Sequence, residues 1–104
     1  MTPAMTFLGL TKRAGRLTIG EESVKIDARA NKAKLILTAC DAGRSLGERA
    51  QNLSTMAKCP HIALPWTKEE LGSLVGRGTP GIMAITDKKM AEAFQMKLEK
   101  EKCQ

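Results

Sequence analysis

Lys34-Leu35-Ile36-Leu37-Thr38-Ala39-Cys40-Asp41 is the stretch of sequence that decides the fold. Its middle is a compact apolar run with the length of a strand, which predicts a strand over Lys34–Cys40. Asp41 is a residue type that caps helix N-termini, so we expect it to begin the next helix. The stretch therefore predicts a strand that passes directly into a helix.

Three further strands are expected on either side of this stretch. Ile82–Thr86 is small and apolar enough to lie inside a sheet, and Asp87 after it can cap a last helix. Arg16–Ile19 alternates polar and apolar residues as a short strand does. His61–Leu64 is expected to be a short buried strand, closed by Pro65.

Helix signals lie between the expected strands. Thr2 and Pro3 combine a hydroxyl cap with proline in the first turn. Glu21–Lys32 begins with acidic residues and ends with a cation, a polarity that suits the helix dipole. Thr67 and Glu70 have the spacing of a capping box, in which each side chain satisfies the other residue's free amide. Each of these signals predicts the start of a helix.

Alternation of helix and strand over the whole length defines the fold class. It implies a central sheet with helices on both faces. We therefore predict an α/β fold, a three-layer α/β/α sandwich around a central mixed four-stranded sheet. The 104 residues are enough for one core, so a single domain over residues 1–104 is expected. The tail, residues 97–104, alternates charges and is expected to fray.

The composition is typical of a small globular protein. Hydrophobic residues make up 42% and charged residues 27% of the chain. The longest apolar runs are far shorter than the roughly 20 residues of a membrane helix, and the first residues do not resemble a signal peptide. The three cysteines are widely spaced and are expected to be free thiols, as in a reducing compartment. These features predict a cytoplasmic protein, expected to be a monomer.

The charge predicts a polyanionic partner. The formal net charge is +6, and residues 1–34 hold most of the excess, with seven basic and three acidic side chains. Nucleic acid is the commonest polyanion that such a domain meets, although an acidic protein remains an alternative. Aromatic residues are only 3% of the chain, too few for a platform on which single-stranded bases stack. A structured RNA, contacted through its backbone and shape, fits better.

Motifs for catalysis, metals or cofactors are weak throughout the chain. Cys59 and His61 are separated by proline and have no second pair of ligands nearby in sequence, so zinc is not expected. Cys40 is interpreted as a buried thiol at the end of a strand. The glycine-rich loop 76–81 lacks the Lys-Ser or Lys-Thr ending of a phosphate-binding P-loop. We therefore predict a protein that is not an enzyme and has no cofactor.

Several short motifs occur together in a characteristic order. They are Leu8-Gly9-Leu10 before Lys12-Arg13-Ala14-Gly15-Arg16, then Gly20-Glu21-Glu22, then Ala33 to Leu37 ending in Asp41, and Glu70-Leu71-Gly72 with Gly76 before an apolar strand. In this order and spacing, the chain resembles the ribosomal protein L-seven-Ae and L-thirty-e family, and its small bacterial members most. The resemblance covers about four fifths of the chain. It implies an α/β/α sandwich that binds kink-turns or related bent internal loops in RNA, in the ribosome or associated with it.

The resemblance also implies where RNA binds. Members of the family use the N-terminal end of the second helix and the loop before the last strand. In this sequence the implied RNA-binding residues are Gly20, Glu21, Glu22 and Lys25 in the first segment, and Arg77, Gly78 and Thr79 in the second. Helix N-termini and glycine-rich loops both offer backbone amides to phosphate. Lys12, Arg13 and Arg16 are expected before the same edge of the sheet, as contacts to flanking phosphates.

Three positions depart from the family's motif at the start of the second helix. Glu22 stands where the motif has asparagine, Ser23 where it has glutamate and Ile26 where it has lysine. Lys25 can supply the charge but points about 100° away around the helix. A carboxylate at position 22 accepts hydrogen bonds only and repels phosphate. An alternative hypothesis is therefore a protein-interaction module of the same fold that has lost RNA recognition.

A further cationic segment has two interpretations of equal weight. Arg29, Asn31, Lys32 and Lys34 follow one another near the end of the second expected helix. They extend the RNA-binding surface in one interpretation. In the other, they are the ordinary cationic end of a helix, where positive charge complements the dipole.

Overall fold

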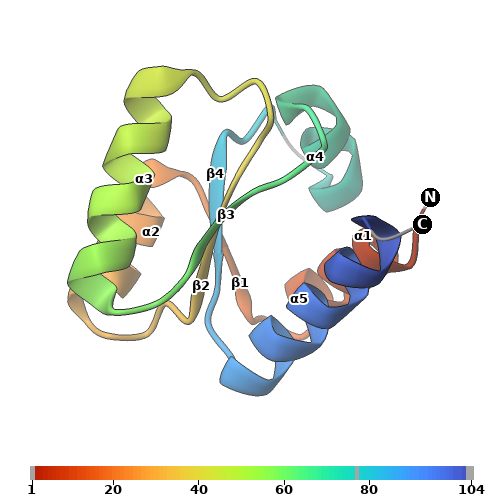
Figure 1. Cartoon of the computed structure of the whole chain (residues 1–104), viewed down its shortest axis with the longest axis horizontal. Coiled ribbons are helices and arrows are strands. Elements are labelled where there is room, and N and C mark those ends of the chain that lie inside the picture. Colours follow the sequence, from red (N-terminus) through yellow and green to blue (C-terminus); the bar gives the residue numbers. More distant parts are fainter. Residues whose placement is uncertain (1, 77, 103–104) are drawn as a thin grey trace.

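The strand expected within Lys34–Cys40 forms the inside of the sheet as β2 (Leu35–Thr38), and all four of its residues are buried. We describe the protein from a computed structural model that covers residues 2–76 and 78–102 (Figure 1). Successive side chains of a strand point to opposite faces. Accordingly, Leu35 and Leu37 pack in one hydrophobic core, while Ile36 packs in a second core across the sheet.

The sheet has the strand order β1-β4-β2-β3, with β1 at Leu17–Ile19, β4 at Ile82–Ile85 and β3 at His61–Ala63. Strand β4 is antiparallel to both of its neighbours, whereas β2 and β3 are parallel. The predicted mixed four-stranded sheet is thus confirmed. Its register decides which loops meet: the end of β1, the start of β4 and the end of β2 all lie at one end of the sheet.

Helices cover both faces of the sheet, as predicted for a three-layer sandwich (Figure 1). Residues of α1, α4 and α5 contribute to the first core, and residues of α2 and α3 to the second. The helices span Pro3–Arg13 (α1), Glu21–Arg29 (α2), Arg44–Ala57 (α3), Lys68–Val75 (α4) and Lys88–Lys102 (α5). Between the two layers, β4 is buried along its whole length. The α/β/α fold follows from a sheet whose two faces are both apolar.

Three helix caps form as the sequence predicts. The Thr2 hydroxyl accepts a hydrogen bond from the amide of Met5 and begins α1 with Pro3 in its first turn. Thr67 and Glu70 make both hydrogen bonds of the capping box at α4. Asp87 accepts from the amide of Met90, and α5 follows. All three caps join residues three positions apart.

The prediction that Asp41 caps the helix after it is wrong. That helix, α3, begins after Gly43, and the Asp41 carboxylate accepts a hydrogen bond of 2.8 Å from the amide of Lys68. Asp41 therefore supports the N-terminus of α4. The end of β2 lies beside the segment before α4, since the Cys40 amide donates to the Trp66 carbonyl. Because these two segments are neighbours, Asp41 caps α4 and not the helix that follows it in sequence.

Other boundaries also differ from expectation. Cys40 is exposed, not buried, because β2 ends at Thr38. Strand β3 is only half buried because it is an edge strand. The expected fraying from residue 97 is wrong as far as Lys102: α5 continues to that residue, because Leu98 is buried in the core. Residues 103–104 lie outside the described part of the chain. No helix within the described ranges has the length and apolarity needed to cross a bilayer.

Candidate nucleic-acid interface

One end of the sheet brings together the two segments that were predicted to bind RNA. The amide of Gly20, just before α2, donates to the carbonyl of Ile82, the first residue of β4. Residues 78–81 come directly before Ile82, so the loop and the start of α2 are neighbours. The end of β2 joins them through a hydrogen bond from Ala39 to Gly81. We call this region the helix-start end.

The start of α3 completes the helix-start end. A Cβ atom at Gly81 would lie 2.7 Å from Leu46 of α3 and 3.9 Å from the Ala42 side chain. A side chain at this position would therefore push the flexible end of Leu46 aside, which shows how closely the loop packs against α3. The sequence resemblance did not single out α3, and its contribution comes from the tertiary structure.

Helices α2 and α3 begin in the same unusual way. Gly20 and Gly43 have φ angles of 97° and 90° with extended ψ angles of 150° and 159°, a conformation essentially reserved for glycine. Within the described residues, neither helix start has a side-chain cap, in contrast to Thr2 at α1 and Thr67 at α4. Their first amides are thus left to solvent or a ligand, and they favour anions.

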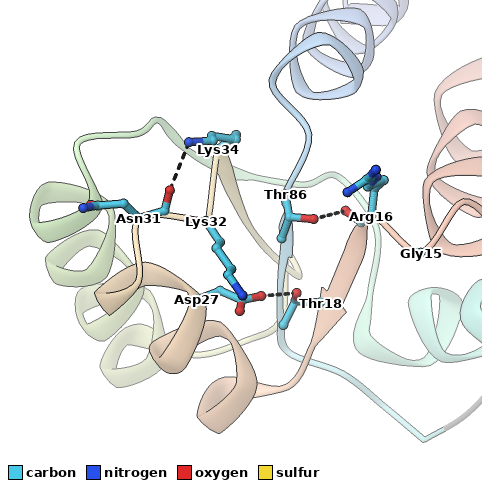
Figure 2. A pocket seen from close by; sticks show the side chains of 8 residues that line it. All are labelled: Gly15, Arg16, Thr18, Asp27, Asn31, Lys32, Lys34 and Thr86. Atoms are coloured by element: carbon cyan, nitrogen blue, oxygen red, sulfur yellow. Dashed lines mark hydrogen bonds between the residues drawn. The ribbon is translucent and has the colours of Figure 1, made fainter.

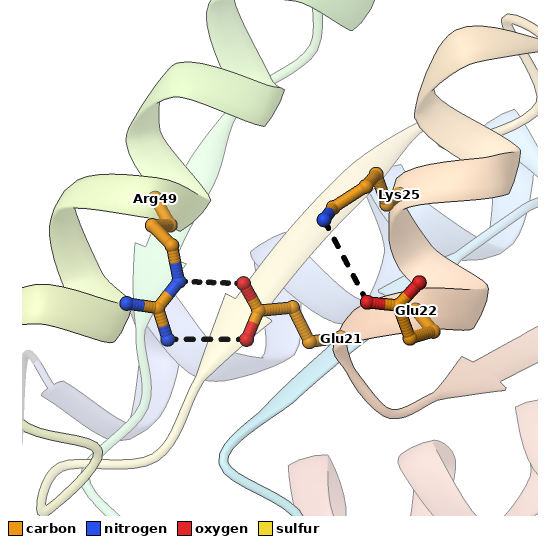
Figure 3. Close-up of polar contacts among 4 residues, drawn as sticks. All are labelled: Glu21, Glu22, Lys25 and Arg49. Atoms are coloured by element: carbon orange, nitrogen blue, oxygen red, sulfur yellow. Dashed lines mark hydrogen bonds and ion pairs between the residues drawn. The ribbon is translucent and has the colours of Figure 1, made fainter.

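The carboxylates of the first turn of α2 are held by cations (Figure 3). Glu21 accepts two hydrogen bonds from Arg49 of α3, at 2.6 and 3.1 Å. These bonds lower the pKa of the Glu21 carboxyl and raise that of the Arg49 guanidinium. Glu22 is 3.7 Å from the ammonium of Lys25. Neighbouring cations thereby offset the acidic charge that would otherwise repel phosphate.

The two remaining departures from the family motif are exposed on α2. Ser23 is exposed, and Ile26 has 64% of its surface accessible. An isoleucine this exposed contributes little to the core, so the position can accept a longer polar side chain. Glu22 is one turn before Ile26, and both therefore lie on the same side of the helix.

The loop between α4 and β4 is described except at one residue. Gly76 ends α4 in the left-handed conformation with φ of 81°, and Gly78 has φ of 59°. Gly78 and Thr79 are exposed, and a Cβ at Gly78 would meet no atom within 4 Å. Open space next to an exposed backbone allows close approach by a ligand. Arg77, also predicted to bind RNA, lies outside the described residues.

The prediction that Lys12, Arg13 and Arg16 lie at the same edge is wrong. The carbonyl of Arg16 accepts a hydrogen bond from Thr86, after the end of β4, whereas Gly20 pairs with Ile82 at its start. Gly20 follows Arg16 by four residue steps of extended chain, which span about 13 Å. Lys12 and Arg13, in the last turn of α1, also precede β1. The three cations therefore belong to the opposite end of the sheet.

The Cys59–His61 segment is occupied by structural contacts. His61 is hydrogen bonded through Nε2 to Thr38 at 2.9 Å and through Nδ1 to Gln51 at 3.1 Å. Burial lowers the pKa of the His61 imidazole and raises that of the Cys59 thiol. Over residues 2–76 and 78–102, no three His, Cys, Asp or Glu side chains are grouped as metal ligands would be.

Together, these features define a small α/β/α sandwich protein with two helix starts that lack side-chain caps beside a glycine loop. No family model matches the chain. It is 32% identical over 74 residues to RNA-binding protein YlxQ of Enterococcus faecium, with 71% of each chain covered. Over 88 residues it is 31% identical to RNA-binding protein YlxQ of Bacillus subtilis strain 168, with 81% of this chain and 83% of that protein covered. The chain belongs to the family of the YlxQ proteins.

A solved structure shares the whole fold. A protein of unknown function from Bacillus halodurans C superposes with a TM-score of 0.86 and 19% sequence identity. The superposition covers 95% of this chain and 99% of that one. The fold formed by the described residues is therefore common to both.

Proposed function

We propose that this protein binds structured RNA, with the helix-start end as its specific interface. The observation that carries the proposal is the meeting of two uncapped helix starts and a glycine loop at one end of the sheet. Backbone amides that lack intrahelical partners are natural donors to phosphate oxygens. The two relatives named RNA-binding protein YlxQ support RNA as the anionic ligand.

Each predicted residue of the two segments at the helix-start end has a defined role in the proposal. Gly20 lets the backbone turn into α2 without a side chain between its amides and RNA. Gly78 and Thr79 offer an exposed loop backbone. Lys25, Glu21 and Glu22 set the charge at the start of α2. Arg77 extends the same loop in the sequence, outside the described residues.

The shape of the protein and its lack of stacking residues support the proposed RNA class. Of the three aromatic residues, Phe94 and Trp66 are buried, and Phe7 packs against the core. Stacking of single-stranded bases has no platform here. A bent internal loop, such as a kink-turn, brings two backbones and exposed base edges close together, which suits a compact surface of amides. The resemblance to the L-seven-Ae and L-thirty-e family points to the same RNA class.

The test compares a kink-turn RNA with the same RNA made fully paired. We expect tighter binding of the kink-turn in a mobility-shift titration, at two salt concentrations, because only the bent loop presents bases to the helix-start end. Gly43→Ala probes the same end at α3. It should reduce the preference for the kink-turn, since an alanine is strained at φ of 90° and moves the amides of α3. Equal affinity for the two RNAs would contradict specific recognition.

We further propose that the protein acts as part of the ribosome or in association with it. Co-sedimentation with ribosomal particles at low salt, lost on ribonuclease treatment, is the expected result. Sedimentation that survives ribonuclease would favour the alternative, a protein-interaction module of the same fold. The paired carboxylate of Glu21 is the observation that favours this alternative, because an ion pair with Arg49 gives the helix start a neutral surface.

A further inference from the structure

The opposite end of the sheet holds two adjoining hollows with cationic linings. The first, of about 480 Å³, is lined by residues of β1, α2 and the segments next to them (Figure 2). The second, of about 260 Å³, is lined by the end of α3, the start of α5 and the residues between α3 and β3. Lys34 lines both hollows. The two therefore form one continuous surface, which we call the cationic end.

Positive charge predominates on this surface. Its described lining carries five cationic side chains and one carboxylate, Asp27, which accepts a hydrogen bond from Thr18. The cations are Arg16, Lys32, Lys34, Lys58 and Lys88. They come from segments far apart in the sequence, and all five are exposed. Only the tertiary structure brings them together.

The helix dipole explains only part of this charge, since it favours a cation at Lys58, the C-cap of α3, but not at Lys88. A cation favours the C-terminal end of a helix, yet Lys88 is the first residue of α5, where the dipole repels it. Lys58 has a φ of 55°, a left-handed conformation that glycine or asparagine adopts more easily. Local structure therefore disfavours the charge of Lys88 and the backbone conformation of Lys58. A ligand-binding role accounts for a cation at both positions.

We propose that the cationic end binds the phosphate backbone of a second RNA segment, without sequence preference. The proposal rests on the proposed function only for the choice of RNA as the ligand. Lysine and arginine contacts to phosphate position a protein on RNA and carry no sequence information. The molecule measures 33 × 27 × 26 Å, so the two ends contact different parts of a folded RNA, or two RNAs. The helix-start end selects the RNA, and the cationic end adds affinity.

A plain RNA duplex is the probe for the cationic end, because it lacks the bent loop that the helix-start end selects. The variant Lys32→Gln with Lys58→Gln removes two charges from the surface. The control, Lys100→Gln with Lys102→Gln, removes two exposed charges from the far end of α5 and leaves the same net charge. Lys34 is left unchanged because its ammonium donates to the Asn31 carbonyl.

The readout is the slope of log affinity against log salt. We expect the slope for the plain duplex to fall by about two units in the Lys32/Lys58 variant and to stay near the wild-type value in the control. Equal slopes in the two variants, or a wild-type protein that does not bind the plain duplex, would overturn the inference. Failure of the proposed function is seen separately, as equal wild-type affinity for kink-turn and paired RNA. Circular dichroism confirms that each variant is folded.

Discussion

The two ends of the sheet differ in how their charges are balanced. At the helix-start end, cations and carboxylates alternate, and all three ion pairs found among residues 2–76 and 78–102 lie on α2 and α3: Glu22–Lys25, Arg44–Glu48 and Glu21–Arg49. At the cationic end, five cations surround one carboxylate. One end therefore presents backbone amides among paired charges, and the other presents unbalanced positive charge.

Because of this difference, we expect the cationic end to contribute affinity for RNA and the helix-start end to contribute selectivity. Unbalanced charge gives affinity that depends steeply on salt and hardly on sequence. Amides and paired side chains at fixed positions give little long-range attraction but can select a shape. The net charge of +6 is thus distributed unevenly over two different surfaces. The following predictions distinguish the contributions of these two surfaces to RNA binding.

The largest effect is expected from changing Lys12, Arg13 and Arg16 to alanine together. Their place before β1 puts them on the side of the cationic end. The triple variant should bind every RNA more weakly, and its salt slope should fall by up to about three units. The preference for a kink-turn over paired RNA should stay unchanged. A selective loss of kink-turn binding in these titrations would show that the two ends do not act separately.

The next effect concerns the motif at the start of α2. Glu22→Asn supplies a side chain that can donate to a base edge, and Ile26→Lys adds a cation on the same side of the helix. Affinity for a kink-turn should rise by roughly 1–3 kcal/mol, the value of a good base-edge contact. The 64% exposure of Ile26 means that stability should change little.

The two changes at α2 should be measured singly and together, because residues one turn apart can couple. Glu92→Asn with Met96→Lys, at exposed positions one turn apart on α5, makes the same change in charge and serves as a control for unspecific effects. A folded double variant that binds the kink-turn no better than the wild type would mean that this face of α2 does not contact RNA.

A smaller effect is expected at Gly78. Its φ of 59° makes Gly78→Val costly, by about 1–2 kcal/mol of folding free energy, because a side chain is strained in the left-handed conformation. Gly78→Asn tolerates this conformation and should keep the thermal midpoint within a few degrees. If the loop approaches RNA closely, both variants should bind the kink-turn more weakly. Full binding by Gly78→Asn would assign the glycine a purely structural role.

The smallest effect is a dependence of stability on pH at the Glu21–Arg49 pair. Because Arg49 lowers the pKa of Glu21 in the folded protein, the pair stabilises the fold above the ordinary carboxyl pKa of 4.5. This contribution is lost as the pH falls through the lower folded value. Urea unfolding at pH 6 should show Arg49→Gln slightly less stable than the wild type, and the difference should shrink as the pH is lowered below 4.5. A difference that does not shrink with falling pH would point to packing by the arginine stem.

The sequence by itself determined the fold class and most helix starts. Thr2, Asp87 and the Thr67–Glu70 capping box each act on residues three positions away. Such contacts form within one turn of helix, so the sequence alone predicts them. The apolar runs of β2 and β4 likewise predicted buried strands, because both faces of each strand pack against helices.

Only the tertiary structure decided how the polar residues are grouped. Asp41 caps α4 across 27 residues, and Glu21 meets Arg49 across 28. Arg16 and Gly20, four residues apart, lie at opposite ends of the sheet because an extended strand separates them. Lys32 and Lys58 share a surface because the sheet register brings their segments together. Strand order and register depend on the packing of the whole chain. They determine whether a charged residue lies at the helix-start end or at the cationic end of the sheet.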